Sequence, residues 1–368
     1  MTELSRDFYN YSYDELVETL QKDFGLTKFR ATQLFEWVYR KGVTDFDLMT
    51  NLGRELREQL AASFVFPKAR MHDRQVSVDG TRKYLFEVDG GDLVEAVMIK
   101  QVSRMTLCVS SQVGCAMACA FCRTGTMGLK RSLSTSEILR QVNGVIEDAK
   151  NFGDSFSNIV FMGMGEPLHN FDGVTRAVRN LTNPIGYALS PRKVTVSTSG
   201  LVPQIRKLAE SKVPVSLAVS LNATTDEVRT QVMPVNKRWP IKELLEAVRQ
   251  FPDGPRKKVT MEYVMLGGLN DTQDDMKRLV SLMRGLPVKV NLIPYNDNAG
   301  LGFKTPAREW VFTWQKHLND HGIQAFIRWS KGADIAAACG QLATESRQKR
   351  AAAPSRLPVL GNEPQAAV

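Results

Sequence analysis

Three cysteines close together in the chain are the residues best suited to chemistry. Cys115, Cys119 and Cys122 have the spacing C-x3-C-x2-C within a stretch of eight residues. Cysteine thiolates bind iron–sulfur clusters, and a 4Fe–4S cluster needs four ligands. Three protein ligands leave one iron open, and an open coordination position is where a substrate binds. The spacing therefore indicates an iron–sulfur site with one free position.

Two other interpretations of this cysteine loop stay open. A structural zinc site has four ligands, often arranged as paired C-x2-C or Cys/His knuckles. Only one such pair is present, Cys119 with Cys122. Unreactive buried thiols are also common, but three of them in one loop beside Gly114 and Gly125 are hard to explain by packing alone. The spacing favours a cluster over both alternatives.

The composition limits the class of protein. The chain has 368 residues, 43% of them hydrophobic, which is enough for one large domain and a small one. Its first residues are polar and it contains no long apolar run, so we expect no membrane span, no signal peptide and a cytoplasmic location. Five cysteines, an odd number and clustered, argue against a secreted disulfide framework.

The charge points to a class of partner. The formal net charge is +9 and the isoelectric point is about 9.3. A protein this basic favours a polyanionic partner, with RNA or DNA first in line. An ordinary basic surface is the alternative, and the charge alone separates the two poorly.

Short apolar strands alternate with helices from residue 106 onward. A capping box, Ser134-Thr-Ser-Glu137, begins the helix after the cysteine loop. This alternation predicts an α/β fold in which helices cover a parallel sheet, as in a partial TIM-type barrel whose chemistry lies at the carboxyl ends of the strands. The predicted strands are at residues 106–110, 158–162, 193–198, 215–221, 258–265, 288–293 and 323–329.

Three further segments flank this core. Residues 1–70 are predicted to form a small helical domain, in which the apolar spacing of residues 30–41 indicates a helix that ends near Gly42. Residues 71–105 are predicted to form a short β extension with turns at Gly80 and at Gly90-Gly91. The core would then be residues 106–345, followed by a disordered basic tail at 346–368.

Small or polar residues follow several of the predicted strands. Because parallel strands end at one face of a barrel, these residues would form a ligand-binding rim, although each alone is typical of an ordinary loop. The segments are Gly163-Met-Gly165-Glu166-Pro167, Ser197-Thr-Ser-Gly200, Ser220-Leu-Asn222 and Pro294-Tyr-Asn296. Cys108, Cys339 and Glu95 are the other candidates. An inert thiol and an exposed strand carboxylate are their simpler interpretations.

Together these motifs resemble the RlmN/Cfr family of radical S-adenosylmethionine (SAM) RNA methyltransferases. The resemblance covers about residues 12 to 345, and Phe121 before the third cysteine is part of the radical SAM pattern. The segments that carry it are Leu107-Cys-Val-Ser-Ser-Gln-Val-Gly-Cys115, the three clustered cysteines, Gly163-Met-Gly-Glu-Pro167, Val196-Ser-Thr-Ser-Gly200, Val290-Asn-Leu-Ile-Pro294 and Ala338-Cys-Gly-Gln-Leu342.

The resemblance implies a fold and a set of cofactor ligands. It implies a partial (β/α)6 radical SAM barrel, a 4Fe–4S cluster held by the three clustered cysteines, and two SAM molecules per turnover. The residues that it places against SAM are Gly165, Glu166, Ser197, Ser220, Leu221, Asn222 and Asn296.

The resemblance also implies a reaction. Cys339 would carry the methyl group, Cys108 would be the resolving thiol that forms a transient disulfide with it, and Glu95 would be the general base. The substrate would be adenine in large-subunit rRNA, methylated at C2 in the RlmN branch, which also acts on tRNA, or at C8 in the Cfr branch. We expect the RlmN branch, a monomer, and an electron donor such as flavodoxin or ferredoxin. Two alternatives remain: a radical SAM enzyme acting on a peptide or small molecule, and a non-enzymatic iron–sulfur protein that binds RNA.

Overall fold

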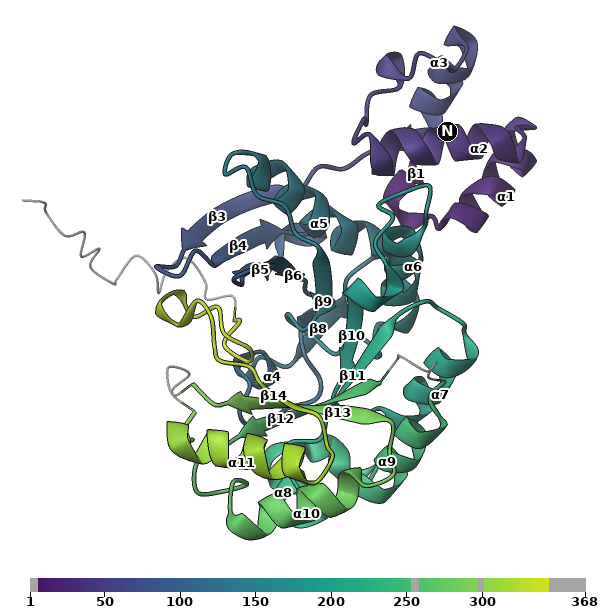
Figure 1. Cartoon of the computed structure of the whole chain (residues 1–368). Coiled ribbons are helices and arrows are strands. Elements are labelled where there is room, and N and C mark those ends of the chain that lie inside the picture. Colours follow the sequence, from purple (N-terminus) through teal and green to yellow (C-terminus); the bar gives the residue numbers. More distant parts are fainter. Residues whose placement is uncertain (1–5, 253–257, 297–300, 344–368) are drawn as a thin grey trace, which may run out of the picture.

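A single mixed sheet forms the centre of the molecule (Figure 1). The computed structural model describes residues 6–252, 258–296 and 301–343. Within them the sheet has ten strands in the order β14-β13-β12-β11-β10-β9-β6-β5-β4-β3. The strands that run parallel to one another are β6 (Met105–Cys108), β9 (Asn158–Phe161), β10 (Val194–Thr198), β11 (Ser216–Ser220), β12 (Val259–Met265), β13 (Val288–Pro294) and β14 (Ala325–Ile327). The predicted partial barrel is confirmed, because the edge strands β14 and β3 do not pair with each other in the described residues.

The β extension continues the barrel sheet. Strands β3 (Arg70–Val76), β4 (Arg82–Glu87) and β5 (Leu93–Lys100) are antiparallel, and β5 pairs with β6. Val97 of β5 lies opposite Cys108 of β6. Because side chains alternate between the faces of a strand, Glu95 lies on the same face as Cys108. The extension therefore brings its own side chains to the inner face of the barrel.

Helices cover the outer face of the sheet. They are α5 (Thr135–Lys150), α6 (Phe171–Thr182), α7 (Val202–Glu210), α8 (Asp226–Val232), α9 (Ile241–Gln250), α10 (Gln273–Met283) and α11 (Arg308–Asp320). The predicted apolar face of α5 is buried, including Ile138 and Val142. On β12, Tyr263 packs against Trp314 of α11 at 5.4 Å between ring centroids, so the neighbouring Glu262 points to the inside of the barrel. Each fully buried aliphatic side chain stabilises the fold by about 1.5–3 kcal/mol. Burial of the apolar side chains against the helices therefore decides which face of each strand is turned toward the barrel interior.

The N-terminal part is a helical unit with a feature that the sequence did not reveal. Its helices are α1 (Tyr13–Phe24), α2 (Lys28–Phe35), the π-helical turn η2 (Glu36–Arg40) and α3 (Arg54–Ser63). Gly42 has a φ of +68° and follows the end of η2, as predicted. The missed feature is a parallel pair of short strands, β1 (Arg6–Asp7) and β2 (Phe64–Val65), which joins the two ends of the unit.

The sequence also predicts a disordered C-terminal tail and no membrane span. The tail expected at 346–368 lies outside the described residues. Among the residues that are described, no helix combines the length and the apolar character needed to cross a bilayer.

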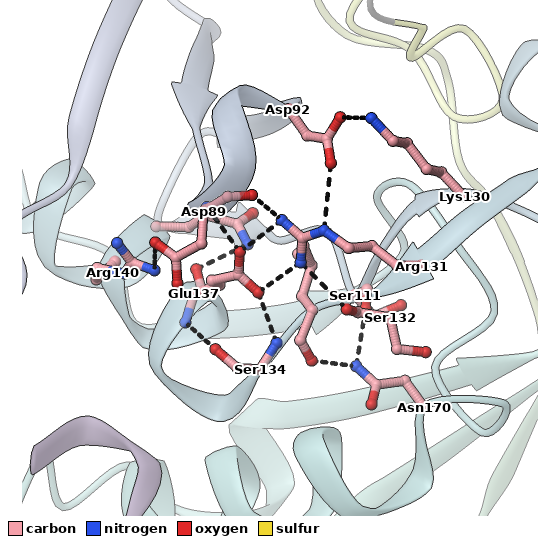
Figure 2. Close-up of polar contacts among 12 residues, drawn as sticks. Asp89, Asp92, Ser111, Lys130, Arg131, Ser132, Ser134, Glu137, Arg140 and Asn170 are labelled. Carbon is pink, nitrogen blue, oxygen red and sulfur yellow. Dashed lines mark hydrogen bonds and ion pairs between the residues drawn. The ribbon is translucent and has the colours of Figure 1, made fainter. Parts of the chain in front are cut away.

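A polar network ties the extension to the barrel beside the cysteine loop (Figure 2). Arg131 of β8 (Leu129–Ser132) donates to both carboxylate oxygens of Glu137 at 2.8 and 2.9 Å. Glu137 also completes the predicted capping box with Ser134 and accepts a 2.9 Å bond from the backbone N–H of Asp89. Arg131 reaches Asp92 as well, at 3.2 Å. One buried carboxylate thus holds together the turn between β4 and β5, the start of α5, and strand β8, which follows the cysteines.

This network generates a stability prediction with an internal control. Glu137 and Glu15 both complete a capping box and both pair with an arginine, but their side chains are 2% and 42% exposed. Glu137→Ala should lower the free energy of unfolding by about 2–4 kcal/mol, because it removes a buried carboxylate that both pairs with Arg131 and completes the cap. Glu15→Ala should cost about 1 kcal/mol, since exposed pairs contribute little. Equal losses in chemical denaturation followed by circular dichroism would contradict this account.

Candidate active site

A pocket opens where the carboxyl ends of the parallel strands meet. Its volume is about 850 Å³, including space open to solvent. This is the face of the barrel at which the sequence predicts chemistry. The residues that line it include all three clustered cysteines and the following others: Met117, Phe121, Thr124, Met162, Gly163, Gly165, Ser199, Ser220, Met233, Val264, Ile293, Pro294, Tyr295, Asn296, Ser330, Cys339, Gly340 and Leu342.

The cysteine loop is held by contacts from both sides of the pocket. It follows β7 (Gln112–Gly114) and leads into the short helix α4 (Arg123–Thr126). The backbone N–H of Ala120 donates to the carbonyl of Val232 at 2.9 Å. Arg123 donates through its N–H to the carbonyl of Gly340 at 2.8 Å. A Cβ at Gly125 would lie 2.9 Å from the Cys119 carbonyl oxygen, so the tight packing of this loop requires a glycine there.

The chemistry of this donor set fits an iron–sulfur cluster. Burial raises the pKa of Cys115 to about 12, and it raises that of Cys119 further, with the neighbouring thiols adding to both shifts. Buried thiols this close together do not ionise on their own, whereas a bound metal centre deprotonates its thiol ligands outright. In the described ranges no three His, Cys, Asp or Glu side chains stand close enough to hold a single metal ion. A cubane cluster takes one thiolate on each iron, so its ligands need not meet at one ion.

The glycine motif after β9 forms the neighbouring wall. Gly165 lines the pocket with a φ of +100°, and a Cβ there would lie 2.5 Å from Gln112, so no other residue fits without rearrangement. Glu166 is buried just behind it, and burial raises the pKa of its carboxyl. Its oxygens accept bonds from the backbone N–H groups of Leu168 (3.1 Å) and Ser199 (2.7 Å). In this structure Glu166 joins the loops that follow β9 and β10.

The other predicted SAM residues divide into two groups. Ser220 and Asn296 line the pocket directly, as Gly165 does. Ser197, Leu221 and Asn222 do not line it. Asn222 is fully buried with a φ of +55°, and its side-chain oxygen accepts a 2.8 Å bond from the backbone N–H of Val264, which does line the pocket. Ser199, two residues after the predicted Ser197, is the hydroxyl that the structure brings to the pocket wall.

One residue that the sequence did not single out holds two of these strand ends together. Arg229 of α8 is fully buried and donates to the carbonyl oxygens of Ser199 (2.8 Å), Ser220 (3.0 Å) and Leu221 (3.0 Å). Burial lowers the pKa of its guanidinium to about 10. A lone arginine in a short polar helix carries no motif, so only the contacts reveal its role. It fixes the strand ends from which the pocket is built.

The structure brings the two remaining cysteines to the same place. Cys108 is buried at the end of β6, and burial raises the pKa of its thiol to about 12. Cys339 is accessible along the pocket but has protein on most sides, and this burial, with the nearby thiols of Cys108 and Cys122, raises its pKa to about 12. All five cysteines are free thiols in this structure.

The segment that carries Cys339 is fastened at several points. We call residues 332–343 the Cys339 segment. At its start, Gly332 donates through its N–H to Asp79 at 3.0 Å, and Asp334 accepts from the N–H of Val78 at 3.2 Å. At its end, the carbonyl of Leu342 accepts a 2.6 Å bond from Thr124, next to the cysteine loop. The segment thus bridges the β extension and the cysteine loop.

Glu95 is not the exposed strand carboxylate of the simpler interpretation. Its residue is 1% exposed, and its carboxylate lies 3.3 Å from the ammonium of Lys83. It also accepts a 3.0 Å bond from the backbone N–H of Ala343, at the end of the Cys339 segment. A buried charged pair must be closely coordinated to be stable. Here it lies between the extension and the segment that carries Cys339.

A second buried carboxyl faces the barrel interior. Glu262 accepts a 2.9 Å bond from Asn291 of the neighbouring strand, and burial raises its pKa to about 7. It is near enough to Cys339 to contribute to the raised pKa of that thiol. Arg328 and Lys289 act on Glu262 in the opposite direction, favouring its charged form. The interior of the barrel below the pocket is therefore polar and contains groups that titrate.

Comparisons with known proteins agree with this geometry. A model of the radical SAM superfamily matches residues 109–282, and a model of the ribosomal RNA large subunit methyltransferase N-terminal domain matches residues 6–65. The chain is 48% identical to a dual-specificity RNA methyltransferase RlmN of Pelobacter propionicus, covering 93% of this chain and 96% of that protein. It is also 48% identical to the RlmN of Geobacter sulfurreducens, covering 91% of each. The crystal structure of a radical SAM methyltransferase from Sphaerobacter thermophilus superposes with a TM-score of 0.83 at 41% identity, covering 92% of this chain and 99% of that one.

The raised pKa of Glu262 predicts a pH dependence of stability. The folded protein keeps this proton up to about pH 7, whereas the unfolded chain loses it near the ordinary carboxyl pKa of 4.5. The free energy of unfolding should therefore fall as pH rises between these values and then level off. Glu262→Gln should remove that slope and be more stable above pH 7 by up to about 3 kcal/mol, at about 1.4 kcal/mol per pKa unit. Denaturation curves from pH 5 to 8 test this, and the exposed Glu243→Gln should leave the native slope unchanged.

Proposed function

Because the chain belongs to the RlmN family of radical SAM RNA methyltransferases, we propose that it methylates C2 of an adenine in large-subunit rRNA and in tRNA. It uses a 4Fe–4S cluster and SAM, as radical SAM RNA methyltransferases do. The observation that carries the proposal is the grouping of five cysteines: three on one loop of the pocket, with Cys339 and Cys108 beside them. The names of the relatives support C2 over the C8 alternative.

The cofactor site is proposed on the pocket wall. Cys115, Cys119 and Cys122 would hold the cluster, which together with SAM supplies a methyl group and a carbon-centred radical when bound. The residues proposed to bind or support SAM are Gly165, Glu166, Ser197, Ser220, Leu221, Asn222 and Asn296. Of these, the three that line the pocket would touch it directly. The buried members would hold those contacts in place.

Three further residues are proposed to act on the RNA base. Adenine C2 is not nucleophilic, so it does not take a methyl cation directly. Cys339 would carry the one-carbon group and bond to the ring through it. Glu95 would accept the ring proton. The Cys108 thiolate would then attack the sulfur of Cys339, so that the carbon–sulfur bond breaks with its electron pair going to the methylene carbon. That carbon would take a proton and become the methyl group of the ring, and a Cys108–Cys339 disulfide would form for a cellular reductant to reopen.

The remaining parts are proposed to serve the RNA. The target adenine must leave its stack to reach a pocket of this depth, and basic surfaces must hold the backbone. We assign docking to the N-terminal unit, residues 1–70, where Lys41 lies 3.6 Å over the ring of Trp37 and Lys28 and Arg30 flank the same helix. We further propose a monomer that acts in the cytoplasm and receives electrons from a flavodoxin or ferredoxin.

Nucleoside analysis tests the reaction. The reconstituted protein, with SAM and a reductant, is incubated with rRNA and tRNA transcripts, and the digested RNA is examined by mass spectrometry. We expect 2-methyladenosine in both RNAs. Only 8-methyladenosine would assign the chain to the C8 chemistry, and SAM cleavage without any methylated adenosine would point to a different substrate.

The roles of the two cysteines outside the cluster generate a further prediction. Cys108→Ala should keep its iron, cleave SAM and load Cys339, but remain bonded to RNA, because no thiol is left to release the product. Turnover should fall by at least about 100-fold, the range expected when an essential group is lost. Cys339→Ala should form no adduct at all. A denaturing gel with labelled RNA separates these outcomes.

The control for this experiment is the iron content of each variant. Both variants should retain the iron of the native protein, since neither cysteine belongs to the cluster loop. Normal product from Cys108→Ala, without a shifted RNA band, would remove Cys108 and the disulfide from the reaction.

A further inference from the structure

Lys83 is a buried cation on the inner face of the sheet. Its side chain is 7% exposed, and its ammonium lies 3.3 Å from Glu95, whose side chain is 1% exposed. Lys83 lies opposite Val97 in the pairing of β4 with β5, and Val97 lies opposite Cys108. Lysine is almost never buried without a partner, and removing one partner of a buried pair leaves an uncompensated charge. The side chain therefore has a specific task at this position.

Both members of this pair also hold the Cys339 segment. The ammonium of Lys83 donates to the carbonyl oxygen of Ala336 at 3.4 Å. The carboxylate of Glu95 accepts from the N–H of Ala343 at 3.0 Å. These two contacts fall three residues before and four residues after Cys339. One ion pair thus contacts the Cys339 segment on both sides of Cys339.

We propose that Lys83 is a positioning residue that keeps Glu95 ionised and oriented while the Cys339 segment is docked. The proposal rests on the roles proposed above for Glu95 and Cys339. A carboxyl this deeply buried would hold its proton if no cation faced it, and a protonated carboxyl accepts no proton from a ring carbon. Lys83 places a positive charge 3.3 Å from the Glu95 carboxylate, at the position where the proposed general base is needed.

The contacts to Ala336 and Ala343 add a dependence on the segment. When the segment is docked, each member of the pair has its partner and a backbone group of the segment. If the segment moved away, the ammonium would lose a carbonyl and the carboxylate an amide, leaving buried charge less compensated. The pair is therefore most stable when Cys339 lies at the pocket. Removal of the ring proton by Glu95 would then be confined to the stage at which the adenine is bonded to Cys339.

The experiment compares Lys83→Met with Arg82→Met in the reconstituted full chain. Arg82 precedes Lys83 in β4, and its side chain is also buried. It pairs with Asp154 at 2.6 Å on the other face of the sheet. We expect Lys83→Met to retain iron and SAM cleavage but to release product roughly 10- to 100-fold more slowly, part of what a positioned general base contributes. RNA-bonded protein should accumulate, as with Cys108→Ala. Arg82→Met should lower stability without raising the adduct fraction.

Two further measurements separate positioning from a merely structural role. Lys83→Arg, which keeps the positive charge, should recover much of the release rate. Hydrogen exchange at the amide of Ala343 should quicken in Lys83→Met and stay slow in Arg82→Met, because Glu95 loses the orientation that protects this amide. If Lys83→Met and Arg82→Met give the same release rate and the same exchange, the proposal is overturned. If Lys83→Met does not fold, Lys83→Arg and its release rate decide.

The failure of this inference is distinguishable from failure of the proposed function. If Cys339→Ala still makes product, or if Glu95→Gln releases it normally, the assigned roles are wrong whatever Lys83 does. If those two variants behave as proposed while Lys83→Met behaves like its control, only the positioning role fails.

Discussion

The removal of water from the cysteine thiols is the constraint on which the pocket depends. Thiols held in a low-dielectric interior do not ionise at neutral pH, and burial raises the pKa of Cys108 and Cys115 to about 12. Each cysteine therefore needs a partner that makes its sulfur reactive. For the loop cysteines the proposed partner is the iron–sulfur cluster. For Cys339 and Cys108 it is the proposed reaction itself, in which a cofactor or substrate meets these thiols.

The placement of charge follows from the same constraint. The side chains behind the pocket are buried, and the ionic groups among them are fixed by several protein contacts. Arg229 donates hydrogen bonds to carbonyl oxygens at the strand ends, and the carboxylate of Glu166 accepts hydrogen bonds from backbone N–H groups. Such fully bonded groups are rigid. The wall of the pocket is thereby set before any ligand arrives, while its reactive sulfurs lie on the cysteine loop and the Cys339 segment.

Sequence reasoning worked where a pattern repeats or a motif is local. The cysteine spacing, the Ser134–Glu137 capping box and the strand–helix alternation all depend on neighbours in the chain, so they predicted the loop, the start of α5 and the partial barrel. It failed for Lys83, Arg229 and Glu262. These are lone charged residues whose partners are distant in sequence, and burial of a charge has no local signature. The sequence did not reveal that Ser199 lines the pocket two residues after the predicted Ser197, since strand ends are the least certain boundaries and a shift of two residues keeps the same face.

The pairing of β1 with β2 has a consequence for how this protein is put together. The chain enters the N-terminal unit at Arg6 and leaves it at Val65, and these two short strands lie side by side. A fold whose two ends meet is formed by one continuous block of sequence, and such folds tolerate insertion and exchange. This block is fitted to the barrel by its own side chains, because Glu15 pairs with Arg176 of α6 and the carbonyl of Tyr11 accepts a bond from Asn180. An exchange of residues 6–65 for another head would therefore have to keep these contacts with α6.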